Sequence, residues 1–291
     1  MKILITGGTG FLGKKILEKK SEHEFFIISR NKLNFNVQCP VNVIRCDLSE
    51  EINERLLPSK LDGIIHLVQS LNYKNFPNSA NEIFNINVSS TAFFLEYARK
   101  CKANFFINAS TGSIYSPSKK LVNEKVLPNV SGNFYAASKL ASEQLVNAYS
   151  NYFNVVNLRF YGLYGPNLQK DKFLFKIINQ MRNKKTIILN NSSLEKTKFQ
   201  FTYVDDAVKV LNCAISDKWN GTTNIASDEI ISLNTILNEI SKRLDVKPVI
   251  KLNKIYKNNF FLADITRLKQ LMPHIKFTKF QEGISYTIDT I

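Results

Sequence analysis

A glycine-rich turn directly after the first apolar run limits what this chain can fold into more than any other feature. Residues 2–6 read KILIT, a candidate buried strand, and Gly7, Gly10 and Gly13 follow it. In such a turn the first glycine permits a tight bend, the second lets the backbone approach a phosphate, and the third lets the next helix pack closely. The free amides and the dipole at a helix start attract anions. The order of strand, turn and helix therefore predicts a dinucleotide-binding unit.

The rest of the first half alternates short apolar runs with helical patterns. Further strands are expected at residues 25–29, 41–46, 63–68, 104–109 and 155–159, and helices at 10–20, 80–100 and 134–152. Strands that alternate with helices indicate an α/β fold with a doubly wound parallel sheet of the Rossmann type. Ligands of such sheets bind beyond the carboxyl ends of the strands.

The pattern changes after Gly165 and Pro166. Helices are expected at 171–183, 204–216, 232–244 and 279–290, with short strands between them. We therefore expect a Rossmann domain over residues 1–165 and a smaller, mostly helical, mainly substrate-binding region over residues 166–291. Segments such as 199–226 are expected to return to the Rossmann domain.

Composition excludes several classes of protein. Of the 291 residues, 44% are apolar and 22% are charged, which is typical of a folded globular chain and not of a disordered one. Every apolar run is far shorter than the roughly 18–20 residues of a membrane span, and no signal-peptide pattern occurs, so a cytoplasmic protein without membrane contact is expected. The four cysteines and three histidines stand singly, which disfavours a metal site. The net charge of +15 is scattered along the chain, which disfavours a nucleic-acid partner.

The residue after the second expected strand bears on the choice of cofactor. A carboxylate there would bind the ribose 2′-hydroxyl of NAD, but this chain has Arg30. Arginine pairs with phosphate, so Arg30, with Ser29 or Lys32 beside it, favours NADP and leaves NAD as the alternative. Asp47, after the third strand, is expected to accept a hydrogen bond from the adenine amine. A helix cap for the segment after Ser49 is the rival explanation.

A tyrosine and a lysine lie one helical turn apart in the helix expected at 134–152. Tyr135 and Lys139 fall on the same face because their spacing is four residues. A nearby ammonium group lowers the pKa of a tyrosine from its usual value near 10, so Lys139 is expected to tune Tyr135 and to reach a ribose hydroxyl. The Ser- and Thr-rich residues 109–115 end the fifth strand, where a hydroxyl can hold a substrate oxygen.

These motifs resemble those of the extended short-chain dehydrogenases/reductases, the NAD(P)-dependent family of nucleotide-sugar epimerases, dehydratases and reductases. The family's TGxxGxxG corresponds to residues 6–13, and its YxxxK corresponds to Tyr135 and Lys139. Weaker resemblances follow in the family's order over nearly the whole chain, at residues 85–91, 158–166, 201–207 and 223–233. Three positions depart from the pattern: Gln69 replaces a small residue, Ser116 replaces Gly, and Gly162 stands where many members carry Asn.

The resemblance implies hydride transfer between a nicotinamide and a sugar carbon, usually C4. Tyr135 would exchange a proton with the sugar oxygen, and Lys139 would position the nicotinamide ribose. Thr111 would stabilise the negative charge on that oxygen, with Ser110 and Ser113 as alternatives.

Arg30 favours one reaction within this family. It favours an NADPH-dependent reductase of a nucleotide-linked 4-keto sugar, often a 6-deoxy sugar, made for a surface polysaccharide. An NAD-dependent nucleotide-sugar 4-epimerase is the alternative. Dehydratases of the family carry an Asp-Glu pair after the catalytic Thr, whereas Gly112 and Ser113 follow here, which disfavours dehydration. A non-catalytic dinucleotide-sensing or nucleic-acid-binding protein is the alternative from a different class.

The resemblance also implies binding residues and a partner. The cofactor is expected to contact Gly7, Gly10, Phe11, Leu12, Gly13, Ser29, Arg30, Asp47, Leu48, Leu67, Val68, Gln69, Asn87, Ser110, Tyr135, Lys139 and Tyr161. The nucleotide-sugar substrate is expected to contact Gln69, Ser113, Gly162, Asn167, Lys172, Phe173 and Gln200. A homodimer through the helices at about 80–100 and 134–152 is expected.

Overall fold

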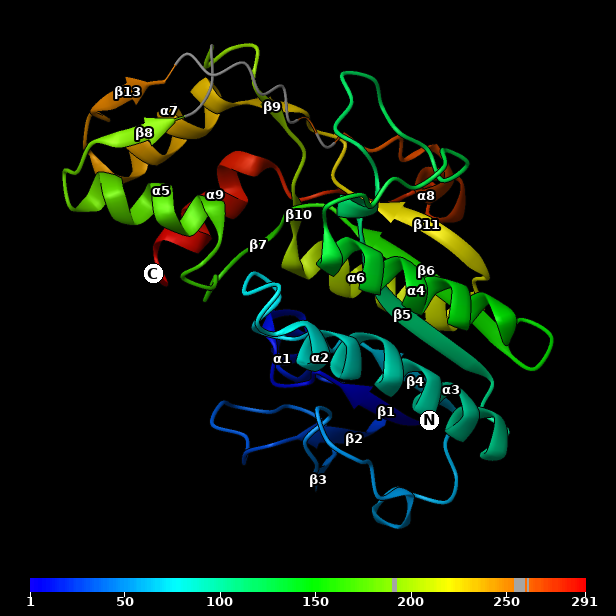
Figure 1. Ribbon diagram of the computed structural model, residues 1–291. Coiled ribbons are helices and arrows are strands. Elements are labelled where there is room, and N and C mark those ends of the chain that lie inside the picture. Colours follow the sequence, from blue (N-terminus) through cyan, green and yellow to red (C-terminus); the bar gives the residue numbers. More distant parts are fainter. Residues whose placement is uncertain (190–192, 254–259, 261) are drawn as a thin grey trace. The chain divides into compact units, whose positions relative to one another are not determined.

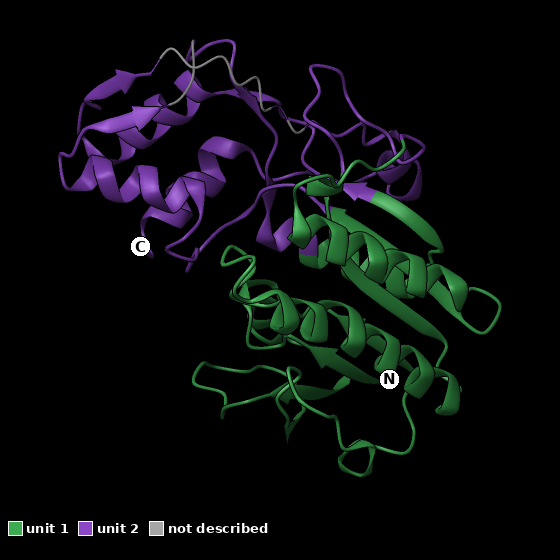
Figure 2. Ribbon diagram, in the orientation of Figure 1, with its two compact units in different colours: residues 1–114, 127–159, 208–223 green, residues 115–126, 160–207, 224–291 purple. Residues whose placement is uncertain are grey.

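The computed structural model describes residues 1–189, 193–253, 260 and 262–291. The chain forms two compact units (Figure 2). Unit 1 comprises residues 1–114, 127–159 and 208–223, and unit 2 comprises residues 115–126, 160–207 and 224–291. Neither unit is one continuous segment, because the chain leaves each unit and later returns to it.

A seven-stranded sheet, carried mainly by unit 1, confirms the expected Rossmann-type α/β fold. Its strands are β1 (Lys2–Thr6), β2 (Glu24–Ser29), β3 (Val41–Arg45), β4 (Gly63–His66), β5 (Phe105–Thr111), β6 (Asn154–Phe160) and β11 (Gly221–Ile225). They lie in the order β3-β2-β1-β4-β5-β6-β11, and β1 pairs in parallel with both β2 and β4. The strand order reverses beside β1, and ligands of doubly wound sheets bind at such a point.

Helices connect the parallel strands and cover the sheet on both faces (Figure 1). The connections contain α1 (Phe11–Leu17), η1 (Glu54–Leu56), α2 (Ala80–Phe84), η2 (Asn85–Ser89), α3 (Ser90–Lys100), η3 (Gly112–Ile114), α4 (Phe134–Ala148) and α6 (Val204–Ser216). Right-handed crossovers toward opposite edges of the sheet place their helices on opposite faces, so α1 lies opposite α3 and α4. The helix expected at 80–100 is present, with the π-helical turn η2 in its middle.

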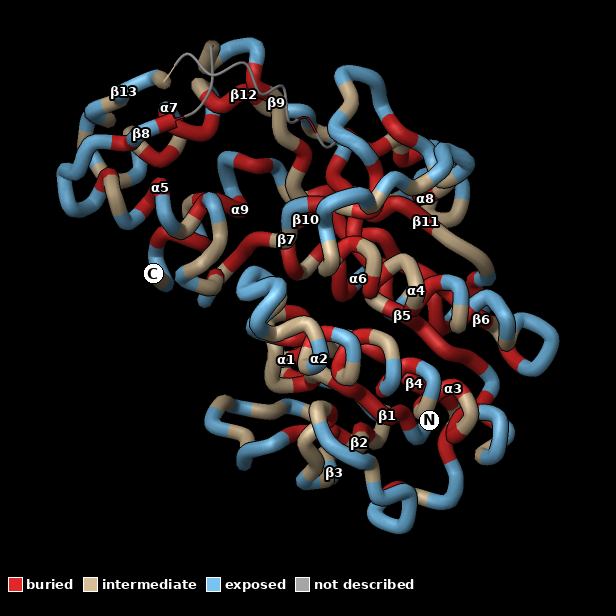
Figure 3. The backbone as a smooth tube through the Cα atoms, viewed as in Figure 1, coloured by how far each residue is buried: buried red, intermediate tan, exposed pale blue. Residues whose placement is uncertain are grey.

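One hydrophobic core cluster of unit 1 lies between the sheet and α3. Leu4, Ile64 and Phe106 come from neighbouring strands, and Phe94 and Leu95 come from α3; all five have no exposed surface. Figure 3 shows this buried layer running along the strands. Each side chain of this size stabilises the fold by roughly 1.5–3 kcal/mol when it leaves water. This packing holds the carboxyl ends of the strands in fixed positions.

Unit 2 contains short paired strands and three helices that pack on one another, α5, α7 and α9. Its elements are β7 (Leu163–Tyr164), α5 (Phe173–Arg182), β8 (Ile187–Leu189), β9 (Lys198–Phe199), β10 (Thr202–Tyr203), β12 (Ile231–Ser232), α7 (Leu233–Leu244), β13 (Ile250–Leu252), α8 (Thr266–Leu271) and α9 (Phe280–Ile288). Helices form at the positions expected near 171–183, 232–244 and 279–290. No helix in the described ranges is long and apolar enough to cross a membrane.

Candidate active site

The glycine turn after β1 has no room for side chains. Gly7 adopts a positive φ of 71°, and a Cβ there would lie 2.9 Å from the backbone nitrogen of Val68. A Cβ on Gly13 would lie 2.4 Å from the carbonyl oxygen of Gly7, so this glycine packs the helix against the turn itself. A Cβ on Gly8 would lie 2.6 Å from the side chain of Ile27, a restriction the sequence reasoning did not identify. The turn is therefore a bare backbone cradle, which fits a pyrophosphate.

The start of α1 completes this turn. Gly10 is the N-cap residue; its N–H donates to the Gly7 carbonyl oxygen at 2.9 Å, and no side chain among the described residues caps the helix. Leu12 is buried and Phe11 is partly buried in the first turn of α1.

Arg30 and Asp47 lie together at the carboxyl ends of β2 and β3. Arg30 Nη1 is 3.9 Å from Asp47 Oδ2, and Arg30 remains mostly exposed. Asp47 Oδ1 accepts hydrogen bonds from the Ser49 N–H at 3.0 Å and the Ser49 hydroxyl at 2.8 Å. The bond from the Ser49 N–H is the main cause that keeps the pKa of Asp47 below its usual value, and Arg30 acts in the same direction. One carboxylate oxygen thus closes a local turn, while the other faces Arg30. The helix that the rival explanation requires after Ser49 is not found, because the next helical turn, η1, begins at Glu54 with Asn53 as its cap.

Two further cofactor candidates lie next to this pair. The Ser29 hydroxyl donates to the carbonyl oxygen of Asn31 at 2.8 Å, so it supports the turn that carries Arg30. Leu48 is buried directly after Asp47.

The end of β4 lies against the end of β1. The Leu67 N–H donates to the Thr6 carbonyl oxygen at 3.1 Å, and the Val68 N–H donates to the Thr6 hydroxyl at 3.4 Å. The buried His66 ring bridges Thr6 and Thr91 through its two nitrogens, at 2.9 and 3.1 Å. Desolvation is the main cause that lowers the pKa of His66 to about 3, and the nearby positive charge of Lys139 acts in the same direction.

Tyr135 lies in the first turn of α4, which Asn133 caps by accepting a hydrogen bond from the Ala136 N–H at 3.0 Å. The Tyr135 hydroxyl donates to Gln69 Oε1 at 3.1 Å and also shares a hydrogen bond with Thr111. Burial is the main cause that raises the pKa of Tyr135 to about 12, against the opposing effect of Thr111. The sequence predicts that Lys139 lowers the pKa of Tyr135, and this is not found. Burial determines the direction of the shift, and Lys139 does not contribute to it.

Lys139 lies one turn further along α4 and is only 2% exposed. Desolvation lowers its pKa to about 8, and the negative charge of Glu143 partly opposes this shift. Glu143, one more turn along, pairs with Arg159 at 2.6 Å. The sequence reasoning missed Glu143, although its spacing of four from Lys139 was a usable signal.

The three candidate hydroxyl groups at the end of β5 have different surroundings. Thr111 bonds Tyr135, and the Ser113 N–H donates to Thr111 Oγ1 at 3.1 Å. The Ser110 hydroxyl instead donates to Glu143 Oε1, since neighbouring residues of a strand point to opposite faces. Within the described part of the chain, Thr111 is therefore the one of these three residues whose side chain contacts Tyr135.

Asn87 links the segment after β4 to α4. Its Oδ1 accepts from the Ser70 N–H at 3.0 Å, and its Nδ2 donates to the Ser138 hydroxyl at 2.8 Å. Asn87 is 1% exposed, so it holds protein segments around Tyr135. Tyr73, which the sequence reasoning also missed, lies with its ring centroid 4.9 Å from that of Tyr135. No sequence signal pointed to Tyr73.

The remaining candidates belong to unit 2. Tyr161 is buried, and its N–H donates to the Ile225 carbonyl oxygen. Gly162 has φ +47°, and a Cβ there would lie 2.6 Å from the ring of Phe201. Gln200 is buried and uses both ends of its amide within unit 2, toward the Ser227 carbonyl oxygen and the Ala263 N–H, each at 2.7 Å.

Three more unit 2 candidates lie nearer its surface. Asn167 is exposed with φ +61°, and its N–H donates to the Thr290 hydroxyl. Lys172 lies 3.9 Å from the carboxylate of Asp171 at the start of α5. Phe173 is 37% exposed and stacks on Phe199 at 5.0 Å.

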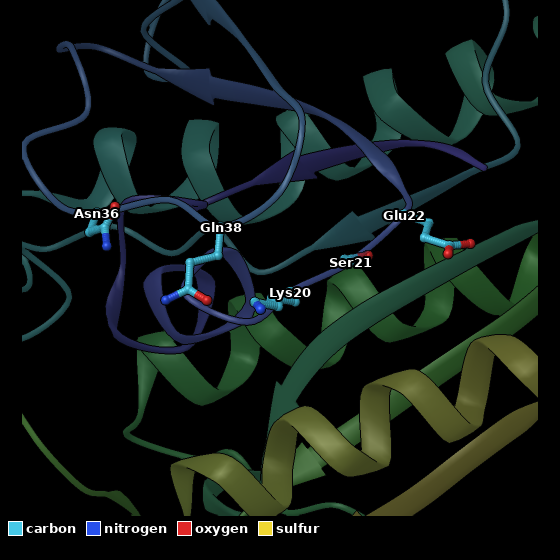
Figure 4. Close-up of a pocket in the computed structure, with 5 residues that line it drawn as sticks. All are labelled: Lys20, Ser21, Glu22, Asn36 and Gln38. Atoms are coloured by element: carbon cyan, nitrogen blue, oxygen red, sulfur yellow. The ribbon is translucent and has the colours of Figure 1, made fainter.

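Unit 1 also has a surface hollow away from the carboxyl ends of its strands. Figure 4 shows its lining residues, Lys20, Ser21, Glu22, Asn36 and Gln38. The first three precede β2, so the hollow lies at the amino end of that strand, opposite to the carboxyl ends that carry the candidate site. Within the described ranges, no group of three or more His, Cys, Asp or Glu residues is arranged to hold a metal ion.

Comparisons with known proteins give a family match, related sequences and similar solved structures. The model of the family described as NAD dependent epimerase/dehydratase matches residues 3–226. CDP-abequose synthase of Salmonella typhimurium is 30% identical over 213 residues, which cover 71% of this chain and 67% of that protein. A dTDP-D-glucose 4,6-dehydratase of Dictyostelium discoideum is 28% identical over 264 residues, 79% of this chain but 59% of that protein's length. The structure of a UDP-glucuronic acid 4-epimerase from Bacillus cereus with UDP-glucuronic acid and NAD has a TM-score of 0.86 at 24% identity, and the match covers 100% of this chain and 98% of that one.

Proposed function

This chain belongs to the NAD-dependent epimerase/dehydratase family, and we propose that it is an NADPH-dependent reductase of a nucleotide-linked 4-keto sugar. The sugar is of the 6-deoxy kind, and its product serves surface-polysaccharide synthesis in the cytoplasm. The observation that carries the proposal is the contact of the Tyr135 hydroxyl with Thr111 at the end of β5, on a helix that also carries the buried Lys139. With a pKa raised to about 12, this phenol is a proton donor at neutral pH, which is the form a ketone reduction uses.

The residues present fit a nicotinamide dinucleotide. The cradle of Gly7, Gly10 and Gly13 would hold the pyrophosphate against the start of α1. Arg30, mostly exposed at the end of β2, would pair with a 2′-phosphate, which supports NADP over NAD. Leu67, Val68 and the other residues proposed for cofactor contact in unit 1 border the same carboxyl edge of the sheet.

The bound dinucleotide supplies the hydride, and the chain supplies orientation and charge. Thr111 donates a hydrogen bond to the sugar oxygen as that oxygen gains negative charge. Tyr135 then gives its proton to the same oxygen. Lys139 holds the nicotinamide ribose.

For the substrate we propose a division of contacts. Gln69 and Ser113 would lie near the sugar, because Gln69 bonds Tyr135 and Ser113 bonds Thr111. The residues of unit 2, above all the exposed Phe173 and the basic Lys172, would contact the nucleotide. Among these residues Gln200 is the weakest candidate for a contact with the nucleotide, because both ends of its amide already form hydrogen bonds within unit 2.

The first test is a fluorescence titration of cofactor-stripped protein with NADPH and with NADH at equal ionic strength. A tenfold preference for NADPH, about 1.4 kcal/mol, is expected. A panel of nucleotide-linked 4-keto-6-deoxy sugars is then assayed for NADPH oxidation, with Tyr135→Phe as the inactive control. If NAD stays bound to the protein through the stripping step and no keto sugar is turned over, the reductase proposal is overturned.

A second candidate is an NAD-dependent nucleotide-sugar 4-epimerase. The observation that favours it is the carboxylate of Asp47 beside Arg30, since an acidic group near the adenosine ribose suits the hydroxyl of NAD. Interconversion of UDP-sugars by the purified protein without added cofactor would support this candidate.

We also propose a homodimer through the helices at about 80–100, which contain α2, η2 and α3, and at about 134–152, which contain α4. These helices contact each other on one face of the sheet (Figure 1). Phe84, the last residue of α2, and Tyr152, shortly after α4, keep 50% and 64% of their surface exposed. Sedimentation at micromolar concentration is expected to give twice the mass of 33.3 kDa, and a monomer would contradict the proposal.

A further inference from the structure

A chain of hydrogen bonds, in which each group donates to the next, runs from Ser113 through Thr111 and Tyr135 to the side chain of Gln69. The Ser113 N–H donates to Thr111 Oγ1, which leaves the proton of Thr111 for its bond with Tyr135. The Tyr135 hydroxyl donates in turn to Gln69 Oε1 at 3.1 Å. A carbonyl oxygen only accepts, so Tyr135 must be protonated to make this last bond.

The backbone next to Gln69 is held in place by buried contacts. The Ser70 N–H donates to Asn87 Oδ1, and the Ser70 hydroxyl donates to Glu82 at 2.7 Å. Asn87 also bonds the Ser138 hydroxyl, which donates to the Tyr135 carbonyl oxygen at 2.8 Å. The contacts thus close a ring from Gln69 through Asn87 to the helix turn that carries Tyr135. Gln69 is therefore a fixed part of the site.

Aromatic contacts hold the same loop, residues 69–79, over the start of α4. The ring of Tyr73 lies 4.9 Å from that of Tyr135, and the ring of Phe76 stacks on that of Phe134 at 4.7 Å. A side chain with an acceptor oxygen is therefore presented to the Tyr135 hydroxyl by a loop that is anchored on both sides.

We infer that Gln69 is a positioning residue that holds the Tyr135 hydroxyl in one orientation, as a hydrogen-bond donor, until a substrate oxygen replaces the Gln69 carbonyl. The inference rests on the proposed function only where it takes Tyr135 as the proton donor. A ketone oxygen can take over this bond directly because it is also an acceptor. Gln69 therefore presents the Tyr135 hydroxyl to a substrate carbonyl as a donor.

The test follows the ionisation of Tyr135 without cofactor or substrate. Full-length protein labelled with [ζ-13C]tyrosine is titrated by NMR, and Tyr135→Phe identifies the signal. Gln69→Leu keeps the size but removes the acceptor, so the pKa of Tyr135 should fall by about one unit. At pH 11 the ionised fraction should then rise from about a tenth to about a half. Leu71→Ala, which changes a side chain of the same loop that is 70% exposed, is the matched control and should leave the titration unchanged.

A second variant guards against a local folding defect in Gln69→Leu. Gln69→Glu keeps the shape and the acceptor but adds a negative charge, so the pKa of Tyr135 should rise. An unchanged titration in Gln69→Leu, or an unchanged or lowered pKa in Gln69→Glu, would overturn the inference and reduce Gln69 to a packing residue. Because these titrations use no ligand, their failure is separate from a failure to reduce keto sugars, which would overturn only the proposed function.

Discussion

Glu143 and Arg159 form a buried ion pair in which Arg159 Nη2 lies 2.6 Å from Glu143 Oε2, with side chains 0% and 7% exposed respectively. Arg159 Nε also donates to Glu143 Oε1 at 2.9 Å, and the Ser110 hydroxyl donates to the same oxygen. The pair joins α4 to β6 one helical turn beyond Lys139. It thus fixes the part of α4 that carries the two residues proposed for catalysis.

Removing one partner of this pair should be costly. Glu143→Gln leaves the Arg159 guanidinium buried without its carboxylate, and the free energy of unfolding should fall by about 3–5 kcal/mol in urea denaturation. The double variant Glu143→Leu/Arg159→Met removes both charges and should lose less than the sum of the two single variants. A loss below about 1 kcal/mol in Glu143→Gln would show that the pair does not hold α4.

The buried charge of Lys139 should lower the free energy of unfolding at neutral pH, although Lys139 serves the reaction. Its pKa is about 8 in the folded chain against an ordinary value of 10.5, so the folded state at pH 7 contains a buried charge that the unfolded state solvates. Lys139→Met should therefore abolish turnover but raise the free energy of unfolding at pH 7 by roughly 1–3 kcal/mol. The gain should shrink as the pH rises from 8 toward 10. A less stable variant at pH 7 would contradict the predicted cost.

His66 should make the folded chain sensitive to mild acid. Burial lowers its pKa from 6.5 to about 3, so as the pH falls below about 6.5 the unfolded chain takes up a proton that the folded chain does not. Stability that is present above pH 6.5 is lost progressively toward pH 3. Between pH 7 and pH 5 this amounts to about 2 kcal/mol. In urea denaturation at both pH values, His66→Gln should lack this extra loss, and His274→Gln, at an exposed histidine, is the control.

Much of this arrangement was predictable because it is local in the sequence. Continuous apolar runs such as residues 2–6 mark strands buried on both faces, and the spacing of Tyr135 and Lys139 places them on one helical face. The contact of Gln69 with Tyr135 was not predictable, because 66 residues separate the two and only the fold joins them. The pKa of Tyr135 was predicted in the wrong direction for the same kind of reason. Spacing identifies a nearby ammonium group, whereas desolvation depends on everything packed around the ring.

Tyr135→Phe separates an enzyme from a binding protein. Loss of the hydroxyl should lower kcat for keto-sugar reduction by about 10²–10⁴-fold, because the proton donor is gone. The affinity for NADPH should stay within twofold, since the ring keeps its packing against Tyr73. Stopped-flow turnover and fluorescence titration give the two readings. Full turnover in the variant would remove Tyr135 from the mechanism, whereas an unmodified protein that binds NADPH but turns over no keto sugar would favour a non-catalytic dinucleotide-sensing or nucleic-acid-binding role.

Arg30 and Asp47 should affect the choice of cofactor in opposite directions. Arg30→Ser removes the cation proposed for the 2′-phosphate, so the affinity for NADPH should fall about tenfold while that for NADH changes little. Asp47→Asn removes a carboxylate 3.9 Å from Arg30 that would repel the same phosphate, so the affinity for NADPH should rise. Arg55→Ser loses one exposed positive charge elsewhere and controls for net charge. If Arg30→Ser weakens both cofactors equally, Arg30 binds no phosphate specific to NADP, and the argument for an NADPH-dependent reductase loses its main support in cofactor choice.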